Sequence, residues 1–135
     1  WALETEGKHL GAEGLSRGVA AVFDDPQKGF YVVAEDDGQV VGGLLITFEW
    51  SDWRNGWFWW IQSVYVDPAW RRKGVYRRLH DTVIGIGKAD NKMCGIRLYV
   101  AQDNHVAQTV YQRVGLTPSR YDVYEDDFVL KHHGR

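Results

Sequence analysis

Arg71-Arg72-Lys73-Gly74-Val75-Tyr76 follows a strand-like run, Ile61 to Val66, and a turn at Asp67-Pro68, and it opens a helical pattern. We call residues 71–76 the basic turn. Because the first amides of a helix have no partner within the helix, a turn at this position points donors toward an anion. The glycine lets that anion approach the main chain closely. The order of strand, basic turn and helix therefore predicts a binding site for a phosphate group.

The spacing of apolar residues predicts the elements on both sides of the basic turn. Val75, Leu79, Val83 and Ile86 recur at helical intervals, which predicts a helix over Val75 to Ala89. Runs rich in β-branched and aromatic residues predict strands over Phe30 to Ala34, Val40 to Phe48, Trp57 to Val66 and Ile96 to Val100.

The remaining elements lie toward the two ends of the chain. After the last of these strands, Asn104 is expected to cap a helix that Gly115 ends. Two further strands are expected over Tyr121 to Glu125 and Phe128 to Leu130, and helical segments over Trp1 to Glu6 and Leu15 to Phe23.

Turn signals indicate how the strands pair. Asp36-Asp37-Gly38 and Asn55-Gly56 are typical of hairpins, so the first three strands are expected to be antiparallel neighbours. A crossover as long as Val75 to Ala89 joins parallel strands. The predicted fold class is therefore α/β in the α+β sense, with a mixed, mostly antiparallel central sheet flanked by helices.

Composition narrows the classes of function. The chain has 135 residues, of which 44% are hydrophobic and 25% charged, and this suits one domain spanning residues 1–135. A formal net charge of -2 gives no general attraction to nucleic acid or to a membrane, so neither is expected as a partner. Cys94 is the only cysteine, which excludes an internal disulfide and fits a cytoplasmic location. The five histidines show no metal-ligand spacing, so no metal is expected.

The order of the elements and two motifs resemble the GNAT N-acetyltransferase superfamily. The first motif, Arg/Gln-x-x-Gly-x-Gly/Ala, is matched by the basic turn, with Tyr76 in place of the usual small residue. The second, Asn-x-x-Ala-x-x-x-Tyr with a Gly-Phe ending, is matched by Asn104, Ala107 and Tyr111 with Gly115-Leu116. The resemblance covers about Phe30 to Leu116. It implies a GNAT-type fold whose usual first strand is absent here, as in a chain shortened at its N-terminus.

The resemblance also implies acetyl-CoA as the acyl donor. Backbone amides of the basic turn would bind the CoA pyrophosphate. The end of the preceding strand would offer backbone groups to the pantetheine arm and an amide to the thioester carbonyl, where it would stabilise a developing oxyanion. The implied cofactor-binding residues are Val64, Val66, Arg71, Arg72, Lys73, Gly74, Val75, Tyr76, Asn104 and Tyr111.

Tyr111 matches the general acid of the family, which protonates the CoA thiolate as it leaves. A phenol suits this task because its reference pKa of about 10 lies above that of a thiol. Many relatives keep a glutamate base on the strand before the basic turn, at a position held here by Trp60. Glu49 and Asp52 are the nearest carboxylates in the predicted topology, and Glu49 is our candidate base, acting through water. Capping of the hairpin is an equally good role for both.

Each assignment has a structural alternative. The charges from Arg71 to Arg78 could form a solvated helix face, and Tyr111 could be a core tyrosine with a satisfied hydroxyl. Asn104 could cap its helix with or without binding the cofactor. The tryptophans and phenylalanine between Trp50 and Trp60 could pack in the core or form a platform for a sugar or a cation.

The sequence therefore predicts an N-acetyltransferase that moves an acetyl group from acetyl-CoA to the amine of a small molecule or peptide by direct attack. The alternative is a non-catalytic GNAT-fold module that binds acyl-CoA. The sequence does not identify the acceptor, and it leaves a homodimer open.

Overall fold

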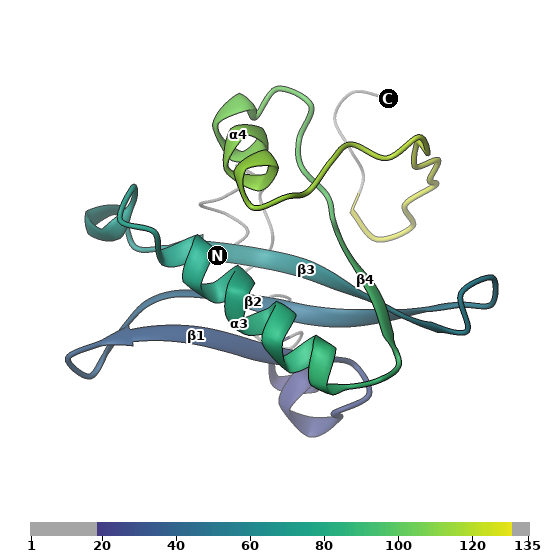
Figure 1. Cartoon of the computed structure of the whole chain (residues 1–135), viewed down its shortest axis with the longest axis horizontal. Helices are drawn as coiled ribbons and strands as arrows, with labels where there is room; N and C mark the ends of the chain where they lie inside the picture. The colour runs from purple at the N-terminus through teal and green to yellow at the C-terminus, as the bar shows by residue number, and fades with distance from the viewer. Residues whose placement is uncertain (1–18, 131–135) are drawn as a thin grey trace.

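The computed structural model describes residues 19–130, and Figure 1 shows their arrangement. The elements are β1 (Phe30–Asp36), β2 (Gln39–Ser51), β3 (Gly56–Val66), the short 3-10 helix η1 (Pro68–Trp70), α3 (Val75–Ala89), β4 (Met93–Leu98) and α4 (His105–Arg113). Residues 19–24 are also helical, in agreement with the end of the helix predicted there. The expected helix over residues 1–6, the start of the next helix and the absence of a first strand lie outside the described residues.

The four strands form one sheet in the order β1-β2-β3-β4. The first two pairs are antiparallel, and β3 pairs with β4 in parallel across the α3 crossover. The hairpin turns contain Asp37 with a φ of 50° and Asn55 with a φ of 48°, a left-handed conformation that aspartate and asparagine tolerate well. The mixed, mostly antiparallel sheet predicted from the sequence is thus confirmed.

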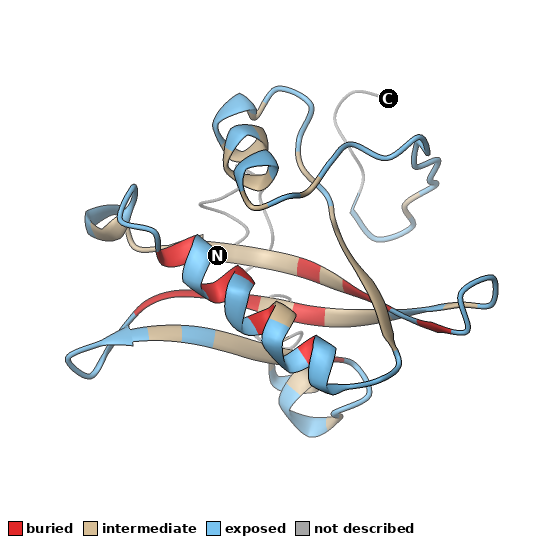
Figure 2. Ribbon diagram, in the orientation of Figure 1, coloured by how far each residue is buried: buried red, intermediate tan, exposed pale blue. Residues whose placement is uncertain are grey.

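One hydrophobic core lies between α3 and the sheet. Figure 2 shows the buried residues of α3 on the side of the helix that lies against the strands. Leu44, Ile46 and Val83 are fully buried there, and Leu79 and Trp59 are nearly so. Because side chains alternate along a strand, Trp59 faces this core, while its neighbours Phe58 and Trp60 lie on the opposite face.

β3 and β4 separate before β3 ends. Their pairing runs from Trp57 opposite Met93 to Ile61 opposite Leu98, whereas β3 continues to Val66. Just beyond the last pair, the register between β2 and β3 shifts by one residue, and Ser63 has a φ of 53°. A bulge of this kind bends a strand and increases its twist. The far end of β3 therefore leaves β4 and leads through η1 to the basic turn, while the chain after β4 turns toward α4 (Figure 1).

The expected strands over Tyr121 to Glu125 and Phe128 to Leu130 are wrong, because residues 116–130 contain no strand. Local side-chain bonds hold this segment instead. The carboxylate of Asp127 accepts hydrogen bonds from the amides of Val129 and Leu130, and the hydroxyl of Ser119 accepts one from the amide of Tyr121. Such bonds compete with sheet pairing for the same backbone donors.

The strand expected over Ile96 to Val100 is displaced toward the N-terminus, since β4 runs from Met93 to Leu98.

Within the part of the chain that the structure describes, no helix is long and apolar enough to cross a membrane.

Candidate active site

The basic turn forms the N-terminus of α3. Arg72 and Gly74 both adopt left-handed backbone conformations, with φ values of 64° and 80°, and Gly74 is the N-cap. The first helical hydrogen bond runs from the amide of Arg78 to the carbonyl of Gly74, at 3.1 Å. The amides of residues 75–77 therefore precede the hydrogen-bonded part of the helix, where the helix dipole favours an anion. Successive backbone N–H groups of a turn next to a helix start form the kind of concave anion site known as a nest.

Side chains on both sides fix the geometry of the basic turn. The guanidinium of Arg71 donates from Nε to the carbonyl of Val66, at 3.3 Å, which ties the turn to the end of β3. Asp67 accepts a hydrogen bond from the amide of Ala69, at 2.9 Å, and so caps η1. Lys73 places its ammonium 5.2 Å from the centre of the Trp70 ring. These contacts hold the main chain in place without occupying the amides at the start of α3.

The space in front of Gly74 is open. A side-chain carbon added at this position would meet no atom of the protein within 4 Å. The glycine is therefore not required by packing. Its positive φ shapes the turn, and its missing side chain leaves room for a ligand beside the main chain.

Tyr76 contributes its backbone to the basic turn and its side chain to the core. The ring is 8% exposed, and its hydroxyl shares a hydrogen bond of 3.2 Å with Nδ1 of His80, which is 4% exposed. Burial, and to a smaller extent the neighbouring Tyr111, raise the pKa of Tyr76. The large residue at this motif position is thus accommodated because it points away from the open side of the turn.

Tyr111 lies on α4 and contacts Tyr76, with the two ring centres 5.3 Å apart and edge to face. Both ends of α4 are fixed by local bonds. Asn104 caps the start, accepting from the amide of Ala107 at 3.1 Å. At the other end, Gly115 has a φ of 99°, and Leu116 donates its amide to the carbonyl of Tyr111 at 3.0 Å, as in a Schellman motif. The helix therefore holds Tyr111 beside the first turn of α3.

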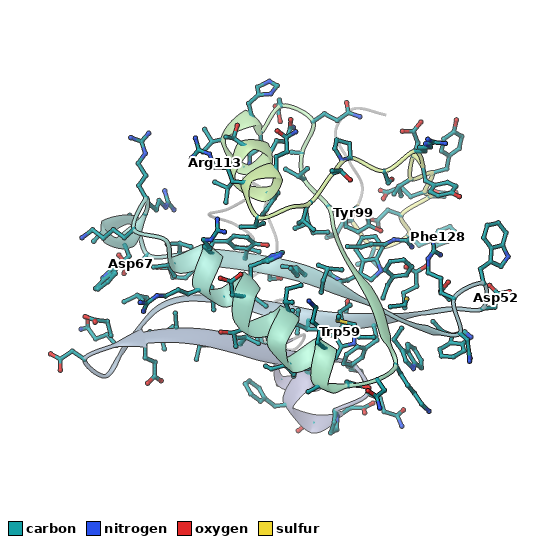
Figure 3. The ribbon with its side chains drawn as sticks, in the orientation of Figure 1. Asp52, Trp59, Asp67, Tyr99, Arg113 and Phe128 are labelled. Carbon is teal, nitrogen blue, oxygen red and sulfur yellow. The ribbon has the colours of Figure 1, made fainter. Side chains whose placement is uncertain are left out.

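A groove of about 880 Å³ lies between the sheet, α4 and residues 116–123. Its floor comes from the face of the sheet opposite α3, through Glu49 on β2, Trp60 on β3 and Arg97 on β4. Tyr111 lines the same groove. Tyr111 therefore contacts Tyr76 of the basic turn and also lines the groove. Tyr99, labelled in Figure 3, lies on the chain between β4 and α4.

Glu49 accepts two hydrogen bonds on the floor of the groove. Trp60 donates its indole N–H to Oε1 at 2.8 Å, and Arg97 donates from Nη1 to the same oxygen at 3.1 Å. The Arg97 guanidinium also stacks on the Phe58 ring, 3.6 Å from its centre. Trp60 packs against Tyr99, with ring centres 4.5 Å apart. The Trp60 indole on β3 thus holds a carboxylate from the neighbouring strand β2.

The structure brings most of the predicted site residues together at the separation of β3 and β4. Val64 and Val66 lie on the part of β3 beyond its pairing with β4, and residues 71–76 follow after η1. Glu49 and Tyr111 line one groove. Asp52, the other carboxylate considered, lies at the tip of the β2–β3 hairpin and accepts from the amide of Trp53 at 2.9 Å (Figure 3).

The sequence did not predict two side chains that contact the candidate site residues, Arg97 beside Glu49 and His80 beside Tyr76. A signal for Arg97 exists in the sequence, because it is the only charged residue in the apolar run from Ile96 to Val100. His80 has no comparable signal in the sequence.

Among residues 19–130, no group of three or more histidine, cysteine, aspartate or glutamate side chains is placed to hold a metal ion.

Comparison with known proteins assigns this fold to a family. Residues 3–116 match the model of the acetyltransferase (GNAT) family. A possible acetyltransferase from Clostridium difficile is 42% identical in sequence, with a TM-score of 0.85 over 96% of this chain and 85% of that one. No match was found among curated protein sequences.

More distant structures share the fold. The acetyltransferase AAC(6')-Iy, solved with the bisubstrate analogue CoA-S-monomethyl-acetylneamine, is 15% identical, with a TM-score of 0.73 over 93% of this chain and 85% of that one. An aminoglycoside 6'-N-acetyltransferase from Acinetobacter haemolyticus is 17% identical, with a TM-score of 0.73 over 93% of this chain and 88% of that one. The family match over most of the chain, together with the 42% identical structure, shows that this protein belongs to the GNAT acetyltransferase family.

Proposed function

We propose that this protein is an N-acetyltransferase that transfers an acetyl group from acetyl-CoA to the amine of a small molecule or peptide. The observation that carries the proposal is the basic turn at the N-terminus of α3, which lies beside the separated ends of β3 and β4 and next to Tyr111. Its left-handed Arg72 and Gly74 and its helix-start amides suit a pyrophosphate. The CoA-bound relative supports the same class of ligand.

The pantetheine arm would run from the basic turn along the end of β3 that extends beyond its pairing with β4. Backbone groups near Val64 and Val66 would bind it, and an amide there would polarise the thioester carbonyl. The three basic side chains at positions 71–73 are exposed and would add attraction to the phosphates. Asn104 would fix the start of α4 and, through it, the position of Tyr111.

The transfer itself would occur in the groove. The amine nitrogen attacks the thioester carbon, the carbon–sulfur bond breaks, and Tyr111 gives its hydroxyl proton to the departing thiolate. The attacking amine must lose a proton, and Glu49 is the carboxylate in the groove that would take it, through water. Both groups line one cavity, which this direct mechanism requires.

The other function considered is a module that binds acyl-CoA without turnover. The groove distinguishes the two, because a binding module needs neither an acceptor space nor a phenol at its edge. The contact of Tyr111 with this space favours the enzyme.

Two measurements test the proposal. Calorimetry should show binding of acetyl-CoA, and a panel of amines should release free thiol from it in a protein-dependent manner. Binding without thiol release from any amine would favour the non-catalytic module. No heat at millimolar acetyl-CoA, with no rise in thermal stability, would contradict both functions, because a ligand of the native state must stabilise it.

A further inference from the structure

The groove beside Tyr111 has a distinctive charge pattern. Of the described residues that line it, only Glu49 and Arg97 carry a formal charge, and these two form an ion pair of 3.1 Å. The lining is therefore electrically neutral as a whole. For a ligand with several positive charges, the groove offers a single carboxylate, Glu49, whose charge is already balanced by Arg97. Neutrality of this kind disfavours a polyamine or a polycationic sugar.

The same groove has a large aromatic surface. Its lining includes five aromatic side chains, Phe58, Trp60, Tyr99, Tyr111 and Tyr121. The Arg97 guanidinium stacks on the Phe58 ring, whereas Trp60 and Tyr99 pack against each other with their planes 37° apart. Tyr99 is 56% exposed, so a ligand can reach this pair. Offset aromatic rings attract a further ring by the same geometry.

The aromatic pair and the carboxylate form one unit, because the Trp60 indole that packs on Tyr99 also donates to Glu49 at 2.8 Å. An apolar ring on Trp60 and Tyr99 would place an attached amine near Glu49. Tyr111 lines the same cavity and contacts Tyr76, the last residue of the basic turn.

We propose that this groove is the acceptor site and that it selects a primary monoamine attached to an aromatic body over polyamines and aminoglycosides. Trp60 and Tyr99 bind the ring, and Glu49 binds the amine. Because Glu49 is already paired with Arg97, the groove does not attract further positive charges of a ligand. This inference rests on the proposed function and narrows its acceptor class.

The test compares two amines by calorimetry, in the presence of CoA and without acetyl-CoA, so that no turnover is needed. The probes are 2-phenylethylamine and spermidine. We expect 2-phenylethylamine to bind at least about 10-fold more tightly, which corresponds to roughly 1.4 kcal/mol, the size of one good aromatic contact. Equal affinities, tighter binding of spermidine, or no binding of either amine would overturn the proposal.

Variants identify the residues responsible. Tyr99→Ala should remove most of the preference, and Tyr99→Phe should retain it, because the ring and not the hydroxyl makes the contact. Tyr124→Ala is the matched control, since Tyr124 is 94% exposed and does not line the groove. A Tyr99→Ala protein that melts like the parent and keeps the preference would contradict the role of this ring.

Thiol release separates this inference from the proposed function. If the protein prefers 2-phenylethylamine but releases no thiol from acetyl-CoA, the enzymatic function is contradicted, whereas the proposed amine-binding site is retained. Thiol release that is faster with spermidine or an aminoglycoside would support the enzymatic function and overturn the acceptor class.

Discussion

At the scale of single residues, Tyr111 combines two contacts that a general acid in the proposed reaction would need. Its ring packs on Tyr76 in the first turn of α3, and it lines the groove that contains Glu49. A tyrosine held only for core packing would need the first contact and not the second. The proposed roles of Tyr111 and Glu49 can therefore be tested apart from their roles in packing.

Replacement of Tyr111 by phenylalanine should separate binding from turnover. The ring contact with Tyr76 stays, so the affinity for CoA should change by less than about 2-fold, while kcat should fall by roughly 10²-fold as the acid is lost. Titration calorimetry and thiol release measure the two quantities. Tyr124→Phe, at an exposed tyrosine outside the groove, is the control. An unchanged kcat would assign Tyr111 to packing.

Replacement of Glu49 by glutamine tests the base. Glutamine keeps an oxygen that can accept from Trp60 and Arg97, so the floor of the groove should survive. Turnover should fall most at pH values below the pKa of the acceptor amine, where the amine is protonated, and should recover as the pH rises. The pH–rate profiles of the parent and of Glu49→Gln test whether Glu49 is the base. A variant profile that overlays that of the parent would exclude Glu49 as the base.

Individual residues also show how far the sequence alone predicts the site. Gly74, Asn104 and Tyr111 were predicted because each has a fixed place in a motif that resembles the family. The structure places Gly74 and Asn104 at the N-caps of α3 and α4, and Tyr111 within α4. The hydrogen bond from Trp60 to Glu49 joins residues of two strands whose register depends on the hairpin and the sheet. The pairing with Arg97 needs a third strand. These contacts depend on tertiary structure, so no local pattern records them.

At the scale of elements, hairpins and helix ends were predictable, and the C-terminal segment was not. The turn at Asp37-Gly38 and the cap at Asn104 are local signals that the structure confirms. Tyr121 to Leu130 has the composition of strands, but a strand also needs an edge to pair with. Asp127 and Ser119 supply local acceptors for this segment, and the sequence gives no measure of that competition.

The basic turn offers a matched pair of glycines for a test of its role. Gly74 and Gly38 both have a φ of 80°, and an added side-chain carbon would meet no atom within 4 Å at either position. Alanine at either site should therefore cost a similar amount of stability, roughly 1–2 kcal/mol for the left-handed backbone. Only Gly74→Ala should weaken acetyl-CoA binding, because only Gly74 lies where the pyrophosphate would bind.

Thermal melts and calorimetry on both variants provide the measurement. Affinity is compared at a temperature where both proteins are folded, so that the lower stability of the variants does not change the measured affinity for acetyl-CoA. Equal losses of acetyl-CoA affinity in Gly74→Ala and Gly38→Ala, or no loss in either, would show that the space beside Gly74 does not receive the ligand.

At the scale of the whole molecule, the site and the core share one helix. The inward face of α3 carries the buried residues Val75, Tyr76, Leu79, His80 and Val83, and its N-terminus forms the basic turn. His80 is the only buried residue of the polar or charged class among the described residues, and its partner Tyr76 contacts Tyr111. A change in the charge of His80 should therefore affect the stability of the fold that positions the site.

The last prediction concerns that stability. Burial lowers the pKa of His80 below its ordinary value of 6.5; among smaller effects, Asp81 raises it and Arg77 lowers it. As the pH falls, the unfolded chain thus takes up this proton before the folded protein does. The stabilisation is complete above about pH 6.5 and is lost as the pH falls from there through the folded pKa.

His80→Gln, which cannot titrate, should have a lower melting temperature than the parent at pH 7.5, and the difference between the two melting temperatures should narrow toward pH 5. His105→Gln, at an exposed position on α4, is the control variant. A gap between His80→Gln and the parent that stays constant over this range would show that the charge of His80 is not coupled to folding, and that the residue acts through packing and its bond to Tyr76 alone.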